Sequence, residues 1–216
     1  MAEQAEGPVS SFRTMGVDLS LQGIGFPGPK GFQLITVDDE RRSVSYKLPP
    51  GQAALTLGEQ VPGVDGKTAF KQLAQVALPG SSGRWLVLFL NGQGGSPGWS
   101  NLILSDEPTS VPPGGYRFVN LLNDRAGILL GSEKHIIPPG ESLVVEVAPP
   151  GNQIIFKAQV YRIPDGEPTV VFSNIWSVDK EQRHLVLILP SDESTTGVAV
   201  KRLSEYVNLI PAASDR

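Results

Sequence analysis

The sequence contains no cysteine and only two histidines among its 216 residues. Without cysteine the chain has no disulfide, no thiolate nucleophile, and no zinc or iron–sulfur site with cysteine ligands. His135 and His184 each lie without a second histidine or a carboxylate at metal-ligand spacing, and no serine stands in a G-x-S-x-G motif. We therefore predict no catalytic residue, no metal site and no cofactor.

Charged residues are scarce, at 19% of the chain, and they give a net charge of −4 and a pI near 5.2. A nucleic-acid-binding surface needs an excess of basic residues, so nucleic acid is not an expected partner. Long apolar runs are also missing. The longest, Trp85 to Leu90, is far shorter than the ~20 residues that span a bilayer, and we expect no transmembrane segment.

Glycine and proline are abundant, at about a fifth of the chain, and hydrophobic residues make up 40%. Apolar runs of four to eight residues alternate with clusters of Pro, Gly, Asn and Asp, a pattern typical of short strands joined by tight turns. The fold class is therefore predicted to be all-β. The predicted strands are Phe32 to Val37, Val44 to Leu48, Ala53 to Leu57, Trp85 to Leu90, Asn101 to Leu104, Tyr116 to Leu122, Leu143 to Val147, Ile154 to Tyr161, Val170 to Asn174, Leu185 to Leu189 and Val198 to Leu203.

The segment from Lys67 to Leu78 fits two structures. Its apolar residues follow helical spacing, with Thr68 as a cap and Pro79 as a stop. The internal repeat described next instead aligns the segment with a strand that ends near Tyr161, and this alignment favours a strand.

Four short matches recur in the same order along the chain and indicate an internal duplication. The matched segments are Gly31 to Val37 with Gly115 to Leu121, Leu48 to Gln52 with Ile137 to Glu141, Phe70 to Val76 with Phe156 to Val160, and Gly83 to Leu90 with Gln182 to Leu189. We predict two tandem immunoglobulin-like β-sandwich units. They would span residues 12–100 and 101–207, with a disordered segment at 1–11 and a tail at 208–216.

Two sequence motifs are interpreted as turns. Gly23 to Gly28 matches the G-x-G-x-x-G pattern of dinucleotide-binding loops, but Pro27 and Pro29 forbid the helix that such a loop needs. It is interpreted as a turn before the Phe32 strand. The acidic run Asp38 to Glu40 does not have calcium-loop spacing and is interpreted as a solvated turn.

Three residues are the candidate ligand-binding residues: Trp99, Trp176 and Asn174. A tryptophan face stacks on the C–H surface of a sugar ring while a nearby amide binds its hydroxyls. The alternative is that the tryptophans pack in the cores, as β-sandwiches often require, and Trp85 is expected to do so. Burial decides between the two interpretations.

The second half of the chain carries a family resemblance. The segments that carry it are Leu104 to Pro108, Pro112 to Leu121, Pro138 to Gly140, Ile175 to Ser177 and Gln182 to Leu187. Together they resemble uncharacterised secreted proteins of Verrucomicrobia and related bacteria. Some proteins of that kind are encoded beside type IV pilus genes and are similar to immunoglobulin-like archaeal pilus subunits. The resemblance implies a place in the cell envelope, although Met1 to Ser20 does not contain the apolar helix of a pilin.

The expected function is that of a non-enzymatic, exported structural and interaction protein of the cell surface or an appendage. It would bind protein partners in the envelope through sheet edges and loops. The alternatives are a carbohydrate-binding module, with glycans as partners, and an enzyme of unrecognised type. Met1 to Gly7 contains no signal peptide, so an extracellular, surface or periplasmic location requires that a leader was removed.

Overall fold

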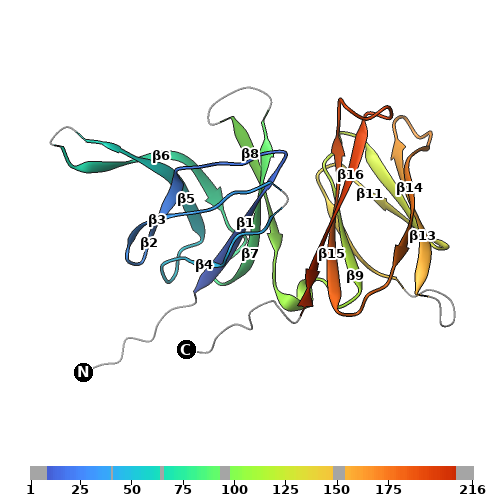
Figure 1. Ribbon diagram of the computed structural model, residues 1–216, viewed down its shortest axis with the longest axis horizontal. Coiled ribbons are helices and arrows are strands. Elements are labelled where there is room, and N and C mark those ends of the chain that lie inside the picture. Colours follow the sequence, from blue (N-terminus) through green and yellow to red (C-terminus); the bar gives the residue numbers. More distant parts are fainter. Residues whose placement is uncertain (1–8, 40, 64–65, 93–97, 148–153, 208–216) are drawn as a thin grey trace. The chain divides into compact units, whose positions relative to one another are not determined.

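The computed structural model describes residues 9–39, 41–63, 66–92, 98–147 and 154–207. The chain divides into two compact units, Met1–Glu107 and Pro108–Arg216 (Figure 1). The described residues form sixteen strands and one short 3₁₀ helix, Pro108–Ser110, with no α-helix among them. The predicted all-β class and the two β-sandwich units are confirmed. No helix in the described ranges is long and apolar enough to cross a membrane.

Unit 1 consists of two four-stranded sheets, with the strand orders β4-β1-β7-β8 and β3-β2-β5-β6. Its strands are β1 (Ser10–Val17), β2 (Ile24–Gly28), β3 (Gly31–Leu34), β4 (Tyr46–Lys47), β5 (Ala54–Pro62), β6 (Thr68–Ala77), β7 (Gly83–Asn91) and β8 (Trp99–Ser105). The buried side chains of both sheets form one apolar core, which includes Phe12, Phe26, Leu57 and Phe89.

Unit 2 likewise has two four-stranded sheets, ordered β12-β9-β15-β16 and β11-β10-β13-β14. Its strands are β9 (Gly115–Asn120), β10 (Arg125–Leu130), β11 (Glu133–Ile137), β12 (Ser142–Glu146), β13 (Ile155–Ile163), β14 (Thr169–Ser177), β15 (Gln182–Pro190) and β16 (Val198–Tyr206). Its core includes Tyr116, Phe118, Phe156 and Trp176.

The two units have the same topology. Adding eight to each strand number of unit 1 reproduces the strand order of both sheets of unit 2. In each unit the first strand pairs in parallel with the seventh, β1 with β7 and β9 with β15, while the remaining pairs of named strands are antiparallel. A shared order with one parallel pair at the same place supports an internal repeat.

The repeat has a different register from the one predicted from the sequence. Only the match of Gly83 to Leu90 with Gln182 to Leu189 joins equivalent strands, β7 and β15. The other three matches are wrong. They join β3 to β9, β6 to β13, and the turn before β5 to the turn before β12, because proline–glycine turns followed by apolar strands recur throughout a β protein.

Strand pairing supplies the correct match for β1. Trp85 of β7 and His184 of β15 are equivalent, and they lie opposite Phe12 and Tyr116 on the first strands. The dipeptide Phe12-Arg13 is therefore the counterpart of Tyr116-Arg117. Both aromatic side chains are fully buried, and both arginines are at most 9% exposed.

Several predicted boundaries need correction. β8 pairs along its length with β7, so it belongs to unit 1, and the boundary between units lies after Glu107 rather than after residue 100. Ser10 and Ser11 belong to β1 instead of a disordered segment. Residues 1–8 and the predicted tail at 208–216 lie outside the described residues.

Two local predictions are also settled. The segment Lys67 to Leu78, left between helix and strand, contains strand β6, which pairs with β5. Gly23 to Gly28, interpreted as a turn, contains strand β2 instead, and β2 forms a hairpin with β3. Pro27 is tolerated there because β2 is only five residues long and pairs with β5 through Ile24 and Gly25 alone.

The outer face of one sheet of unit 1 has two aromatic rings over paired glycines. Gly25 and Gly58 lie opposite each other on β2 and β5. The rings of Phe32 and Phe70 occupy the space above them, with ring centroids 5.8 Å apart. Because a β-carbon on either glycine would collide with a ring, the two glycines are needed for this packing.

We predict that Gly58→Val destabilises unit 1 by about 2 kcal/mol, since the new side chain overfills an occupied space. Its β-carbon would meet the Lys71 carbonyl and would lie 2.6 Å from the Phe70 ring. The control is Gly80→Ala, whose β-carbon has no neighbour closer than 3.5 Å. Chemical denaturation should separate the two variants, and equal stabilities would contradict the packing described.

Candidate functional site

Trp99 and Trp85 belong to the core of unit 1. Trp99 begins β8, is 9% exposed, and packs edge-on against Phe89 with ring centroids 5.0 Å apart. Trp85 is partly buried and packs against the same core, as predicted for it. The face of Trp99 is therefore not open to a sugar, and its proposed role as a stacking platform is wrong.

Trp176 belongs to the core of unit 2 and is only 4% exposed. One face stacks on Tyr116, with ring centroids 5.3 Å apart and an interplanar angle of 9°. The Arg202 guanidinium lies over the Trp176 ring, 5.2 Å from its centroid. The ring of Trp176 is thus occupied within its own unit, and the sugar-stacking role predicted for it is also wrong.

The aromatic stack continues to a buried histidine that the sequence did not single out as functional. His184 lies against Tyr116 with ring centroids 4.4 Å apart. Burial away from water, with the nearby charge of Arg202, lowers the pKa of His184 to about 4. Burial also raises the pKa of Tyr116 to about 12, despite Arg202. Both side chains are neutral at physiological pH.

His184 and Ser204 form a hydroxyl–imidazole pair across β15 and β16, with 2.8 Å between Nδ1 and Oγ. Such a pair is the start of a nucleophile and base arrangement. An imidazole with a pKa near 4 is a weak base, however, and its buried Nε2 has no hydrogen-bond partner within the described residues. The pair is better explained as a cross-strand packing contact than as catalytic machinery.

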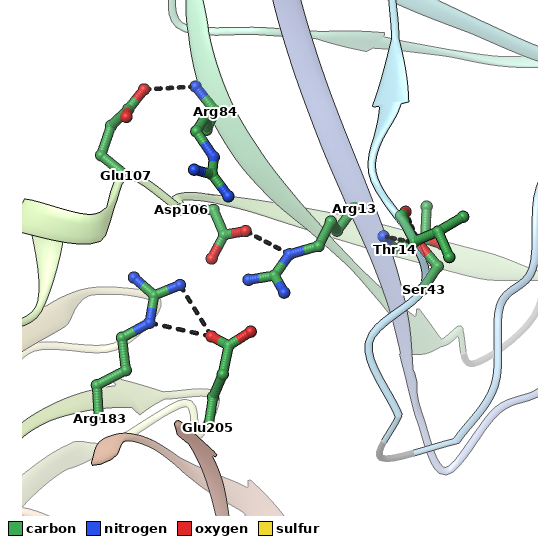
Figure 2. A network of polar contacts seen from close by, with 9 residues as sticks. Arg13, Thr14, Ser43, Arg84, Asp106, Glu107, Arg183 and Glu205 are labelled. Atoms are coloured by element: carbon green, nitrogen blue, oxygen red, sulfur yellow. Dashed lines mark hydrogen bonds and ion pairs between the residues drawn. The ribbon is translucent and has the colours of Figure 1, made fainter. Parts of the chain in front are cut away.

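Figure 2 shows two buried ion pairs, one in each unit. In unit 1, Arg13 Nε lies 2.6 Å from Asp106 Oδ2, and both side chains are at most 10% exposed. In unit 2, Arg183 donates from Nε and Nη2 to Glu205 Oε2 at 3.0 and 2.9 Å. Buried charges of this kind are stable only when they are paired.

The repeat register relates these residues. Arg183 lies opposite Glu205 on β15 and β16, and the equivalent positions of unit 1 are Arg84 and Asp106. The counterpart of Arg13 is Arg117. Each unit thus has two arginines and one carboxylate at equivalent positions. A salt bridge joins the carboxylate to the first-strand arginine in unit 1, and a salt bridge joins it to the seventh-strand arginine in unit 2.

Asn174 lies on β14, the last strand of its sheet, and is exposed. Its side-chain Oδ1 accepts a hydrogen bond from the Ile175 backbone N–H at 2.8 Å. The oxygen of the Asn174 side chain is therefore already engaged within its own strand. It accepts a hydrogen bond from a backbone N–H group of an edge strand.

The orientation of the β14 backbone follows from one bond next to the strand. Val178 N donates to Ile154 O at 2.7 Å, in register with the β13–β14 pairing. Along an antiparallel strand, the backbone N–H and C=O groups of one residue bond the neighbouring strand, and those of the next residue point away from it. Ser173, Ile175 and Ser177 therefore turn their backbone groups away from β13, in agreement with the side-chain bond that Ile175 N makes. The Ser177 carbonyl already accepts a hydrogen bond from the Tyr116 hydroxyl at 2.7 Å.

We call Ser173, Ile175 and Ser177 the open edge of β14. All three are exposed, and the Ile175 side chain is 61% exposed. What the arrangement offers chemically is a row of backbone donors and acceptors beside an apolar side chain. No cluster of three His, Asp or Glu side chains that could bind a metal occurs in the described ranges.

Comparison with known proteins adds no family to these observations: no family model matches the chain, and no curated protein matches it.

We predict that acidification destabilises unit 2 through His184. The unfolded chain binds a proton at His184 near pH 6.5, whereas the folded one binds it only near pH 4. The free energy of unfolding should therefore fall as the pH drops from 6.5 towards 4. His184→Gln removes the group that binds the proton and keeps a polar partner for Ser204. Denaturation at several pH values should show a shallower fall for the variant, and parallel profiles would contradict the assignment.

The buried ion pair of unit 1 gives a second prediction. Asp106→Asn removes the negative charge that lies 2.6 Å from the buried Arg13 guanidinium and should cost about 3 kcal/mol in the free energy of unfolding. The matched control is Glu59→Gln. It breaks the exposed pair Lys71–Glu59 and should cost less than ~1 kcal/mol. Urea denaturation measures both, and an equal effect would show that burial of the pair is unimportant.

Proposed function

We propose that the protein is a non-enzymatic structural and interaction protein that binds a partner segment in extended form along the open edge of β14. The observation that carries this proposal is the open edge itself, a row of three alternate residues whose backbone groups point away from β13 and whose middle residue is the exposed Ile175. Main-chain hydrogen bonds of this kind supply affinity when a strand adds to a sheet, and neighbouring side chains supply selectivity.

The composition of β14 favours this role. Edge strands that avoid pairing carry charges, prolines or very short lengths. The nine residues of β14 include no charged residue and no proline. By contrast β6 carries Lys71, β11 carries Glu133 and Lys134, and β16 carries Lys201, Arg202 and Glu205.

Two edge strands of unit 1 also lack charged residues but suit a partner less well. β3 is only four residues long. β8 has seven residues, and its apolar side chains are buried or partly buried. β14 combines length, absence of charge and the exposed apolar residues Val170 and Ile175.

The proposal includes a location outside the cytoplasm, at the cell surface, in the periplasm or on a pilus-like appendage. It rests on the resemblance of the segment from Leu104 to Leu203 to secreted proteins, some of them linked to pilus genes and immunoglobulin-like. A tandem pair of β-sandwiches with an edge that accepts strands is compatible with an envelope protein whose partners are other proteins.

The carbohydrate-binding alternative receives no support from the side chains on which it depended. Trp99 and Trp176 are both buried, and Asn174 binds its own strand. We therefore place protein partners ahead of glycans.

A strand-forming peptide tests the proposal. We expect a capped, uncharged peptide of alternating valine and threonine to shift the amide resonances of Ser173, Ile175 and Ser177 saturably. Ile175→Glu should abolish the shifts by placing a charge on the edge. Its own fold should tolerate the change, since the new carboxylate would lie opposite Lys157 on β13.

The matched control is Ile136→Glu, which replaces a 55% exposed isoleucine on the edge strand β11. This variant should bind the peptide as the unaltered protein does. Shifts confined to another edge, or none at millimolar peptide, would overturn the proposal.

A further inference from the structure

The geometry points to a second copy of this chain as the occupant of the open edge. We infer that β14 of one copy pairs antiparallel with β14 of another, with Ile175 on the twofold axis. The inference rests on the proposed function, because it needs the edge to accept a strand, and it adds the identity of the partner and the register.

The first argument is the symmetry of the open edge about Ile175. Ser173 and Ser177 flank it at equal distance, and the backbone groups of all three residues point away from β13. With Ile175 on the axis, Ile175 faces its own copy and each Ser173 faces Ser177 of the other copy. This register uses every position of the open edge. The central pair exchanges two backbone hydrogen bonds. In each flanking pair Ser177 N–H donates to Ser173 C=O, while the Ser177 carbonyl would accept Ser173 N–H on its second lone pair, beside the bond that it accepts from the Tyr116 hydroxyl.

The second argument is where the register must stop. On one side a bulge at Val171 interrupts the regular strand, since Phe172 and Val170 lie opposite consecutive residues of β13. On the other side β14 ends at Ser177. The regular stretch between the bulge and the strand end is therefore centred near Ile175, so the twofold register and the available backbone coincide.

The third argument is charge. Antiparallel pairing of a strand with itself about a twofold axis brings its residues close to one another, and like charges placed opposite each other are destabilising. β14 has no charged residue to repel its copy. Pairing also covers Ile175, which is the most exposed large apolar residue of the strand at 61%.

Asn174 regulates the access of the second copy. Its side chain occupies the Ile175 N–H, which lies at the centre of the proposed pairing. A second strand must displace this amide in both copies before the central pair of bonds can form. Asn174 thus keeps the association weak and reversible, in the way that short polar side chains compete with backbone pairing.

Analytical ultracentrifugation over a concentration series tests the self-association. We expect a monomer–dimer equilibrium for the unaltered chain. Ile175→Glu should weaken it about tenfold or more, because two carboxylates then face each other across the axis. Asn174→Ala should strengthen it about threefold, because the edge donor is released. Ile136→Glu should leave it unchanged.

Cysteine cross-linking tests the register, and the absence of natural cysteine makes each introduced thiol unique. Ile175→Cys should form a disulfide-linked dimer under mild oxidation, since hydrogen-bonded antiparallel pairs have α-carbons ~5.5 Å apart, within disulfide range. Ser173→Cys alone should not, because its own copy lies four residues, or ~13 Å, away. An equimolar mixture of Ser173→Cys and Ser177→Cys should cross-link.

The outcomes separate this inference from the proposed function. A chain that stays monomeric and fails to cross-link, yet shows the peptide-induced shifts, overturns the second copy as partner and leaves strand binding intact. A chain without dimer, cross-link or peptide shifts overturns both. Equal cross-linking by Ser173→Cys and Ile175→Cys, each alone, overturns the register and with it the twofold pairing proposed.

Discussion

The parallel pairing of the first strand with the seventh organises each unit of this protein. It joins residues far apart in the sequence, Ser10 with Gly83 in unit 1 and Tyr116 with His184 in unit 2. Through it the first strand reaches the interior of its sheet and places an aromatic side chain in the core. The same pairing brings Arg13 within reach of Asp106, the residue after β8, so the buried ion pair of unit 1 depends on it as well.

The all-β class and the eleven predicted strands were readable because their apolar runs are bounded by turn residues. β1 was not, because its buried side chains include Ser10, Arg13 and Thr14, and polar residues in a core hide the periodicity that reveals a strand. The repeat register was misjudged for a related reason: turn motifs resemble one another wherever they occur. Equivalence became visible only through strand pairing, which a single sequence does not contain.

The candidate site shows the same division. The sequence pattern singled out Asn174 and Trp176, and both were predicted to contact a ligand. Trp176 is buried, a result that depends on the opposite sheet. Asn174 is exposed on the strand that has the open edge. The direction in which the backbone groups of that strand point follows from its hydrogen-bond register with β13, which the bond from Val178 N to Ile154 O fixes. No residue type indicates which alternate residues of a strand bond the neighbouring strand and which point away from it, so the open edge could not be predicted from composition or spacing.

The strand order also determines when each strand can find its partner during synthesis of the chain. β2, β3, β5 and β6 form hairpins from neighbouring segments, so they are ready to assemble as the chain emerges from the ribosome. β1 has to wait until β7, which ends at Asn91, has been made. During that interval each unit is half a sandwich with one apolar face uncovered, and pairings of high sequence separation form slowly. Nascent chains of this protein are therefore most in need of a chaperone just before their seventh strand appears.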